Sequence, residues 1–158
     1  MTASERTIRH DTFTIERTYA ASSARVFGAW ADPVAKRTWF VEGEGWDVER
    51  YEQDFRIGGR ERSAFRFRGG VLITNDTTYL DILPDRRIVA AYTMTMDGKI
   101  MSASLATTEF EKAGAGTRLI LTEHDAFLDG IDKSGTRKEG CAGLLLALEK
   151  YLAASKAA

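Results

Sequence analysis

The sequence predicts a single α+β domain in which a helix near the C-terminal end covers one face of an antiparallel sheet. Alternating apolar and polar runs are separated by turn signals such as Asp97-Gly98, which favour local hairpins and therefore antiparallel pairing. A helix is predicted over residues 136–151, where apolar side chains recur at helical spacing. They are Cys141, Leu144, Leu145, Leu148 and Leu152. Such a stripe needs one face of the sheet to cover.

The first strand is predicted from Thr12 to Tyr19, where apolar and polar residues alternate. Phe13, Ile15 and Tyr19 share one parity, which we expect to face the core. Arg17 lies on the same parity. It is therefore expected to point inward, where it would need an acidic partner.

Two short helices are predicted directly after this strand. Ser22 and Ser23 can cap the first helix, which carries apolar residues at helical spacing. Asp32-Pro33 ends that helix and caps the second, which runs through residues 36–39.

Six further strands are predicted between the short helices and the last helix. Several of them are bounded by turn residues, as at Gly58-Gly59 and Pro84-Asp85. The strands are expected over residues 46–49, 60–68, 77–83, 88–96, 101–111 and 117–126. In the second of these, Phe65 and Phe67 are expected to face inward and Arg66 and Arg68 outward, and cross-strand ion pairs with acidic residues are expected for the arginines.

Length and composition indicate one soluble domain, residues 12–158, after a flexible tail over residues 1–11. The formal net charge of -1, from 22 basic and 23 acidic residues, provides no field to attract nucleic acid or an anionic membrane. No apolar run is long enough to span a bilayer. The first residues lack the apolar core of a secretory signal, so the cytoplasm is the expected compartment.

One cysteine and two histidines are too few for a metal site of the usual kinds. Cys141 lies in the apolar stripe and is expected to be a buried, inert thiol. His10 falls in the tail, and His124 lies on the outer parity of the last strand, where a solvated histidine is expected. We therefore predict no metal, no cofactor and no internal disulfide.

Glu123 is the candidate functional residue. Leu119 and Leu121 share its parity in the last strand, so Glu123 is aimed at the core beneath the last helix. A carboxylate there must be paired, neutralised or hydrated in a cavity. Two interpretations stay open. Glu123 is either a functional acid whose pKa is raised by burial, or one half of an ion pair with an inward Arg17 or Arg60.

Several motifs occur in the order found in a known superfamily. They are Val26-Phe27 with Trp30, Asp32-Pro33, Trp39-Phe40, Asp54-Phe55-Arg56-Ile57-Gly58-Gly59, Tyr79-Leu80-Asp81-Ile82-Leu83-Pro84 with Arg87-Ile88-Val89, Gly116-Thr117-Arg118-Leu119, and Arg137 with Gly140. With them, residues 12–152 resemble the START-related SRPBCC superfamily and, more closely, its activator-of-heat-shock-protein-90-ATPase-like branch. Residues 104–107 and 126–130 resemble an uncharacterised bacterial group within that branch. The resemblance implies a helix-grip fold, in which a curved antiparallel sheet wraps around a long C-terminal helix, with two short helices after the first strand.

The resemblance also implies a cavity between the sheet and the last helix. Aromatic and flexible apolar side chains would form either its wall or a solid core, and the resemblance favours the wall. Asp81, on the parity of Tyr79, is expected to join the network of Glu123. The expected cavity residues are Trp39, Phe40, Trp46, Phe65, Tyr79, Asp81, Tyr92, Met94, Leu121, Glu123 and Leu145.

The sequence thus favours a protein that binds a small apolar or aromatic molecule, with Glu123 or Asp81 as its polar anchor. Two other functions stay open: a cyclase- or hydrolase-type enzyme with Glu123 as general acid or base, and a module that interacts with a chaperone. No nucleophile–base pair is visible, so no other catalytic residue is predicted. Nucleic acid and membranes are not expected as partners, and a homodimer is left open.

Overall fold

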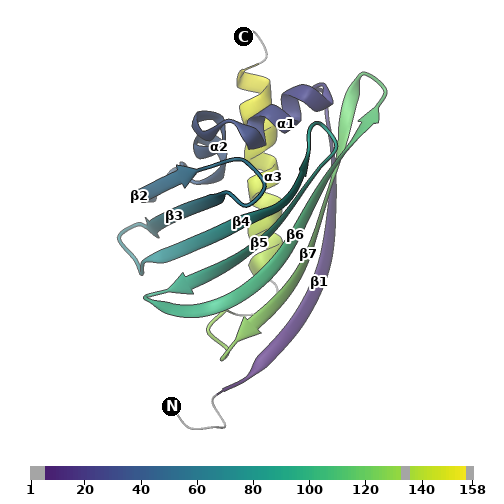
Figure 1. The fold of residues 1–158 in the computed structure, drawn as a ribbon. Coiled ribbons are helices and arrows are strands. Elements are labelled where there is room, and N and C mark those ends of the chain that lie inside the picture. Colours follow the sequence, from purple (N-terminus) through teal and green to yellow (C-terminus); the bar gives the residue numbers. More distant parts are fainter. Residues whose placement is uncertain (1–5, 133–135, 156–158) are drawn as a thin grey trace.

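The computed structural model describes residues 6–132 and 136–155, which form one curved antiparallel sheet and three helices. Figure 1 shows the sheet bending around the last helix, with the two short helices at one end. The elements in chain order are β1 (Ile8–Tyr19), α1 (Ser23–Ala31), α2 (Pro33–Phe40), β2 (Trp46–Gln53), β3 (Arg60–Phe67), β4 (Ile73–Leu83), β5 (Arg87–Met96), β6 (Lys99–Ala113), β7 (Gly116–Leu128) and α3 (Thr136–Ala154). The predicted α+β helix-grip architecture is confirmed.

Seven strands in the order β1-β7-β6-β5-β4-β3-β2 make up the sheet, and every neighbouring pair is antiparallel. Strands β2 to β7 pair in sequence order, whereas β1 pairs with β7 near the other end of the chain. The β1–β7 register begins at Ile8, opposite Leu128. The expected tail over residues 1–11 is therefore wrong for residues 8–11, because pairing with β7 makes them part of a strand. Residues 1–5 lie outside the described residues.

Side-chain caps set the two short helices where the sequence predicts them. Ser22 Oγ accepts a hydrogen bond from the backbone N–H of Arg25 at 3.2 Å. Asp32 Oδ1 accepts from the backbone N–H of Val34 at 3.1 Å, and Pro33 occupies the first turn of α2. Both helices contact α3. Within the described ranges, no helix is long and apolar enough to cross a membrane.

The core lies at the end of the sheet that α1 and the second half of α3 cover. Leu119 of β7 and Leu148 of α3 are fully buried. Phe110 of β6 lies edge-on to Phe27 of α1, with ring centroids 5.5 Å apart. Burial of these leucine and aromatic side chains holds the helices on the inner face of the sheet.

Alternation predicts the buried face of β1 correctly except at one position. Phe13, Ile15 and Tyr19 are buried, whereas Arg17 is exposed and donates to the carbonyl of Glu16 at 2.8 Å. The inward orientation expected for Arg17 is therefore wrong. The reason is that β1 is an edge strand, so a long side chain can leave its inner face around the free edge and reach water.

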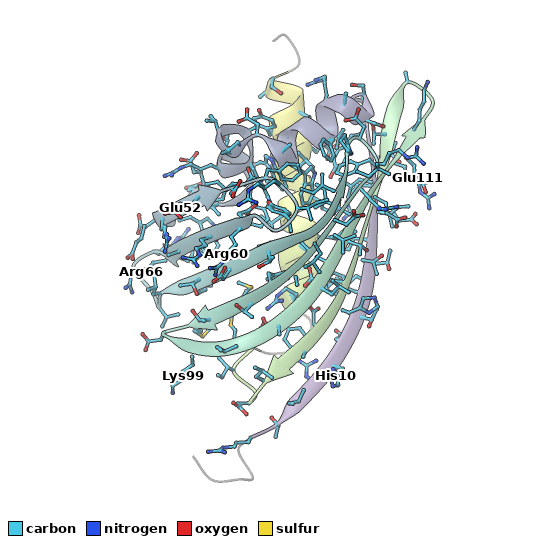
Figure 2. The ribbon with its side chains drawn as sticks, in the orientation of Figure 1. His10, Glu52, Arg60, Arg66, Lys99 and Glu111 are labelled. Carbon is cyan, nitrogen blue, oxygen red and sulfur yellow. The ribbon has the colours of Figure 1, made fainter. Side chains whose placement is uncertain are left out.

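Arg60 also points away from the core. Its Nε lies 3.2 Å from Oδ1 of Asp76 on β4, and Arg66 pairs with Glu49 on β2 at 2.8 Å. Figure 2 shows Arg60 and Arg66 on the outer side of the sheet, away from α3. The predicted outward ion pairs along β3 are confirmed, and Arg60 as an inward partner for a buried acid is wrong.

Candidate functional site

A pocket lies between the sheet and the first half of α3, where the middle of the sheet carries small side chains. On the inner face, Ala90 of β5 pairs with Ala106 of β6, and Ala106 pairs with Glu123 of β7. Two adjacent alanines leave room that larger side chains would fill. The pocket has a volume of about 600 Å³, which is in the range of small-molecule sites.

Ten of the eleven residues expected around a cavity line this pocket. They come from α2, from α3 and from strands across the sheet. The ten are Trp39, Phe40, Trp46, Phe65, Tyr79, Tyr92, Met94, Leu121, Glu123 and Leu145. Most of them are aromatic or aliphatic, so the greater part of the wall they form is apolar.

Asp81 is the exception and does not reach the pocket. The register between β4 and β5 shifts between Tyr79 and Asp81, which moves the later residue off the inner face. Asp81 pairs instead with Arg87, with 2.6 Å between Oδ2 and Nε, and its side chain is 38% exposed. The expectation that Asp81 joins the network of Glu123 is therefore wrong.

The mouth of the pocket is marked by the lining residues that are exposed to solvent. Among the described residues, these come from the segment between α2 and β2, from the first residue of β2 and from the first half of α3. They are Glu42, Gly43, Trp46, Gly140 and Gly143. A Cβ atom added at either helical glycine would meet no heavy atom within 4 Å. Close packing therefore does not explain these two glycines, and their missing side chains leave the mouth wider.

Arg137, in the first turn of α3, is the centre of one buried polar group at the pocket. Its side chain is 9% exposed and donates hydrogen bonds to five side chains. The acceptors are Tyr92 (3.0 Å), Ser104 (3.1 Å) and Glu123 (3.5 Å) for Nη1, and Ser102 (2.7 Å) and Asp132 (3.0 Å) for Nη2. We call Arg137, these five residues, Asp125 and Cys141 the Arg137 cluster.

Glu123 has a donor on each carboxyl oxygen. Oε1 accepts from the hydroxyl of Tyr92 and from Arg137, and Oε2 accepts from the thiol of Cys141 at 3.6 Å. Asp125 lies 3.6 Å from Arg137, but neither of its oxygens accepts a hydrogen bond from the described residues. Two buried carboxyl groups beside one arginine favour a protonated form, because like charges in a dry site repel.

Burial raises the pKa of Glu123 from its usual 4.5 to about 7, and the neighbouring Asp125 carboxyl adds to the rise. The hydrogen bond from Tyr92 and the charge of Arg137 lower this pKa in part. Near neutral pH, Glu123 therefore holds a proton part of the time. Burial also raises the pKa of Tyr92 and of Cys141 well above their usual values, so both keep their protons.

A second buried polar group lies on the α2 side of the pocket. Nζ of Lys36 lies 2.7 Å from Oε1 of Glu61, and the two side chains are 6% and 4% exposed. The hydroxyl of Tyr79 donates to the same oxygen, and the amide of Gln53 donates to that hydroxyl at 2.9 Å. The ammonium of Lys36 also lies 5.3 Å from the ring centroid of Trp30. We call these five residues the Lys36 cluster.

Polar atoms without a partner collect around the Lys36 cluster. The indole N–H of Trp30, Oε1 of Gln53 and the hydroxyl of Tyr51 are buried and have no hydrogen-bond partner among the described residues. Oε2 of Glu61 has no donor in the same part of the chain, and only one N–H of Lys36 has an oxygen acceptor there. Buried polar groups are normally paired, so this corner has unused hydrogen-bonding capacity.

A row of polar side chains connects the two clusters across the inner face. Glu61 pairs with Thr77, Thr77 with Tyr92, Tyr92 with Ser104, and Ser104 with Asp125. Neighbouring strands lie about 4.8 Å apart, so roughly 19 Å of curved sheet separates the two ends of the row. Glu61, Thr77 and Tyr92 all line the pocket, which therefore extends along much of this row.

The comparisons with known proteins agree with this architecture. A family model described as Activator of Hsp90 ATPase homolog 1-like protein matches residues 20–153. The chain belongs to this family. A solved protein from Rhizobium loti is 47% identical, with a TM-score of 0.86, over 92% of this chain and 99% of its own. An uncharacterized protein from Rhizobium leguminosarum is 41% identical, with a TM-score of 0.91, over 95% of this chain and 99% of its own.

More distant members of the family share the fold. The solution structure of an AHSA1-like protein from Aeromonas hydrophila has a TM-score of 0.69 at 18% identity, over 92% of this chain and 94% of its own. No curated protein matches the sequence. The branch inferred from the sequence motifs is confirmed by the family match, and its helix-grip fold by the solved relatives.

Arg137, rather than Arg17 or Arg60, is the arginine that meets Glu123. In the sequence, Arg137 is recognisable only as part of a family motif. A signal for its position is nevertheless present, because Arg137 precedes Cys141 by four residues and so lies on the apolar stripe of α3. A charged residue on such a stripe needs a buried partner.

Lys36 and Glu61 are also missing from the sequence-based prediction. Glu61 shares the parity of Phe65 in β3, which is the same signal that identifies Glu123. Lys36 precedes Trp39 by three residues and therefore lies on the same face of a short helix. Read together, these two patterns place a lysine and a glutamate on inward faces.

The expectations for the histidine and the cysteine of this region are confirmed in position. His124 is exposed on the outer face, where Nδ1 lies 3.2 Å from Oγ1 of Thr12. Cys141 is buried on the stripe of α3, and its lack of reactivity stays a prediction. Among the described residues, no group of histidine, cysteine, aspartate and glutamate side chains is arranged to hold a metal ion.

Proposed function

We propose that this protein binds a small, largely apolar or aromatic molecule in the pocket between the sheet and α3. The observation that carries the proposal is a pocket of about 600 Å³ whose wall is mostly apolar and contains two groups of buried charged side chains. Apolar surface supplies affinity, and a few fixed polar groups orient the ligand. The resemblance of this chain to the SRPBCC superfamily implies a cavity between the sheet and the last helix, and it therefore supports the same function.

The side chains of the pocket wall favour flat ligands and can adapt to ligands of different shapes. Met94 of β5 and Met101 of β6 line the pocket, and unbranched thioether side chains change shape at low cost. Trp39 and Phe40 lie edge-to-face with centroids 5.6 Å apart, and Trp46 lies edge-to-face with Phe65 at 5.2 Å. An aromatic or fused-ring molecule would extend these ring contacts.

Titration of the native protein with a fluorescent apolar dye tests the proposal. Saturable binding is expected, and Gly143→Leu should weaken it strongly, because the added side chain enters the open space at the mouth. Ala153→Leu is the matched control, since it adds leucine to an exposed position of α3 outside the pocket. No binding by the native protein, or equal binding by both variants, contradicts the proposal. If the dye binds as expected, native mass spectrometry of the purified protein can identify a ligand that co-purifies with it.

Proton transfer on a bound molecule is a second candidate function, and the pKa of about 7 for Glu123 favours it. The Glu123 carboxylate would remove a proton from the carbon next to a ligand carbonyl, leaving an enolate, and return a proton in the reverse step. In D2O, the native protein should then exchange deuterium into the methyl group of naphthyl methyl ketone, as followed by NMR. Exchange at the same rate with Glu123→Gln would exclude this role.

A further inference from the structure

We propose that the Lys36 cluster is the polar end of the ligand site and selects an uncharged molecule that carries a hydroxyl or carbonyl oxygen. This inference rests on the proposed function, because it assumes that a ligand occupies the pocket, and it adds the chemical class of that ligand. It also moves the polar anchor away from Glu123 and Asp81, where the sequence alone places it.

Unused donors and an unused acceptor meet in this corner of the pocket. Lys36, Glu61 and Trp30 all line the pocket and are each more than nine-tenths buried. Lys36 has N–H groups without an oxygen acceptor among the described residues, and the indole N–H of Trp30 has no partner there at all. Either can donate to a ligand oxygen, and Oε2 of Glu61 can accept from a ligand hydroxyl. A hydrogen bond to a charged group is among the stronger ones available in a protein.

The charge of the pocket favours an uncharged ligand. Lys36 and Glu61 neutralise each other at 2.7 Å, so neither sign of ligand charge finds an unbalanced partner at this end. Among the other lining residues, Arg137 is accompanied by Glu123 and Asp132, and Glu42 lies at the mouth. An anionic ligand would therefore lose its hydration without a free cation to compensate it.

The Arg137 cluster is a poorer polar end for the ligand because its hydrogen bonds are made internally. Arg137 donates to five side chains, and both oxygens of Glu123 already accept. The atoms that lack a donor there belong to Asp125, whose side chain is 0% exposed and does not line the pocket. A ligand group would have to break an existing bond in this cluster, whereas it would only add bonds at the Lys36 cluster.

Four naphthalene probes of similar size separate the possibilities: naphthalene, naphthol, naphthyl methyl ketone and naphthoate. Their binding to the native protein is measured by fluorescence or calorimetry at neutral pH. Naphthol and the ketone should bind about tenfold more tightly than naphthalene, as expected for one hydrogen bond to a charged group, and naphthoate should bind most weakly. The preference is the ratio of the dissociation constants of naphthalene and naphthol. A change in the apolar wall affects both constants alike and therefore largely cancels in this ratio.

The double substitution Lys36→Met with Glu61→Leu removes the charges together, which avoids leaving one buried charge unpaired. It should bring naphthol and naphthalene to within about twofold of each other while naphthalene still binds. Trp30→Phe removes an N–H that has no internal partner together with part of the indole ring, and it should reduce the preference in part, while naphthalene binding reports the change in ring size. If the double variant does not fold, as judged by its thermal transition, Trp30→Phe decides the question. Glu111→Gln, at an exposed residue outside the pocket, is the control and should keep the preference, whereas Glu123→Gln tests the competing anchor.

Each outcome has one meaning. If none of the probes binds the native protein, the proposed function fails, and the inference fails with it. If naphthalene and naphthol bind equally well, the pocket binds ligands but the Lys36 cluster does not select them. If naphthoate binds most tightly, or if Glu123→Gln removes the preference and changes at the Lys36 cluster do not, the inference is overturned and the anchor lies elsewhere.

Discussion

The two buried polar clusters of the pocket differ in how completely their hydrogen bonds are satisfied. In the Arg137 cluster, one guanidinium donates to five side chains, and both oxygens of Glu123 accept. In the Lys36 cluster, the ammonium meets one carboxylate oxygen, and the indole N–H of Trp30 meets no acceptor among the described residues. Both clusters line the same space, yet only the second has unpartnered polar atoms on residues that line the pocket, because the unpartnered oxygens of the first belong to Asp125, which does not line it.

This difference indicates a division of roles. Taking charged groups out of water costs several kcal/mol for each, and a cluster offsets this cost only when its bonds are complete. The Arg137 cluster, whose hydrogen bonds are complete except at Asp125, therefore serves the fold: Arg137 ties the start of α3 to strands β5, β6 and β7 through Tyr92, Ser104 and Glu123. An incomplete cluster at a pocket is costly in the free protein, and a ligand that completes it gains affinity.

The largest expected effect is the loss of stability on replacing Arg137. Arg137→Met leaves Glu123 and Asp125 buried without a cation, which should lower the free energy of unfolding by about 3–5 kcal/mol. Urea denaturation at neutral pH measures the change. As the pH falls from 7 to 4.5 the loss should shrink, since a protonated Glu123 no longer needs the arginine.

The control for this substitution is Arg118→Met. Arg118 also has two carboxylate partners, Glu16 and Glu111, but it lies on the outer face with a side chain that is 42% exposed. Its replacement should cost less than about 1 kcal/mol. Equal effects of the two arginine substitutions would show that the Arg137 cluster does not hold α3 to the sheet.

The next effect in size is a dependence of stability on pH through Glu123. Its pKa is raised from 4.5 to about 7 in the folded protein, so folding takes up a proton between these values. The contribution to stability is fully present below pH 4.5 and is lost as the pH rises through 7. At about 1.4 kcal/mol for each pH unit, the loss is on the order of 3 kcal/mol.

Denaturation curves of the native protein and of Glu123→Gln across this pH range measure the effect. The difference between the two proteins should fall with rising pH, because glutamine does not titrate. Glu111→Gln, at the exposed partner of Arg118, should show no such fall. A flat difference for Glu123→Gln would mean that the Glu123 carboxyl group stays ionised throughout this range, and the raised pKa would be ruled out.

The fold is predictable from the sequence because its signals are local. The leucine stripe of α3, the caps at Ser22 and Asp32, and the hairpin at Asp97-Gly98 each depend on a few neighbouring residues. The prediction fails at the beginning of β4, which starts at Ile73 rather than Thr77. Its inward residue Asn75 lines the pocket, so the apolar alternation that marks a strand is missing there.

The site is less predictable because its pairs form across the sheet. Parity alone identifies Glu123 as an inward acid, but which arginine meets it depends on how α3 lies on the sheet. Asp81 shows the same limit, because one irregularity in the β4–β5 register moves it to an exposed pair with Arg87. Lys36 and Glu61 come from a helix and a strand whose contact no local pattern reports. Tertiary packing decides all three cases.

The smallest expected effect is a gain in stability at the mouth of the pocket. Gly140→Ala and Gly143→Ala should each raise the free energy of unfolding by about 0.5–1 kcal/mol, because glycine loses more backbone entropy in a helix than alanine. Neither new methyl group would meet an atom within 4 Å, so no clash offsets the gain. Gly59→Ala is the control, and it should destabilise, since its Cβ would lie 2.1 Å from the carbonyl oxygen of Asp54.

The same alanine variants sharpen the distinction between fold and ligand site. One methyl group at the mouth should leave binding of naphthalene and naphthol nearly unchanged, whereas Gly143→Leu should weaken both and leave their ratio intact. Stability would then rise at Gly143 without any change in selectivity, which belongs to Lys36, Glu61 and Trp30 deeper in the pocket. A change in the naphthol preference on substituting Gly143 would place the polar contact of the ligand at the mouth instead, and the comparison between the two clusters would no longer account for selectivity.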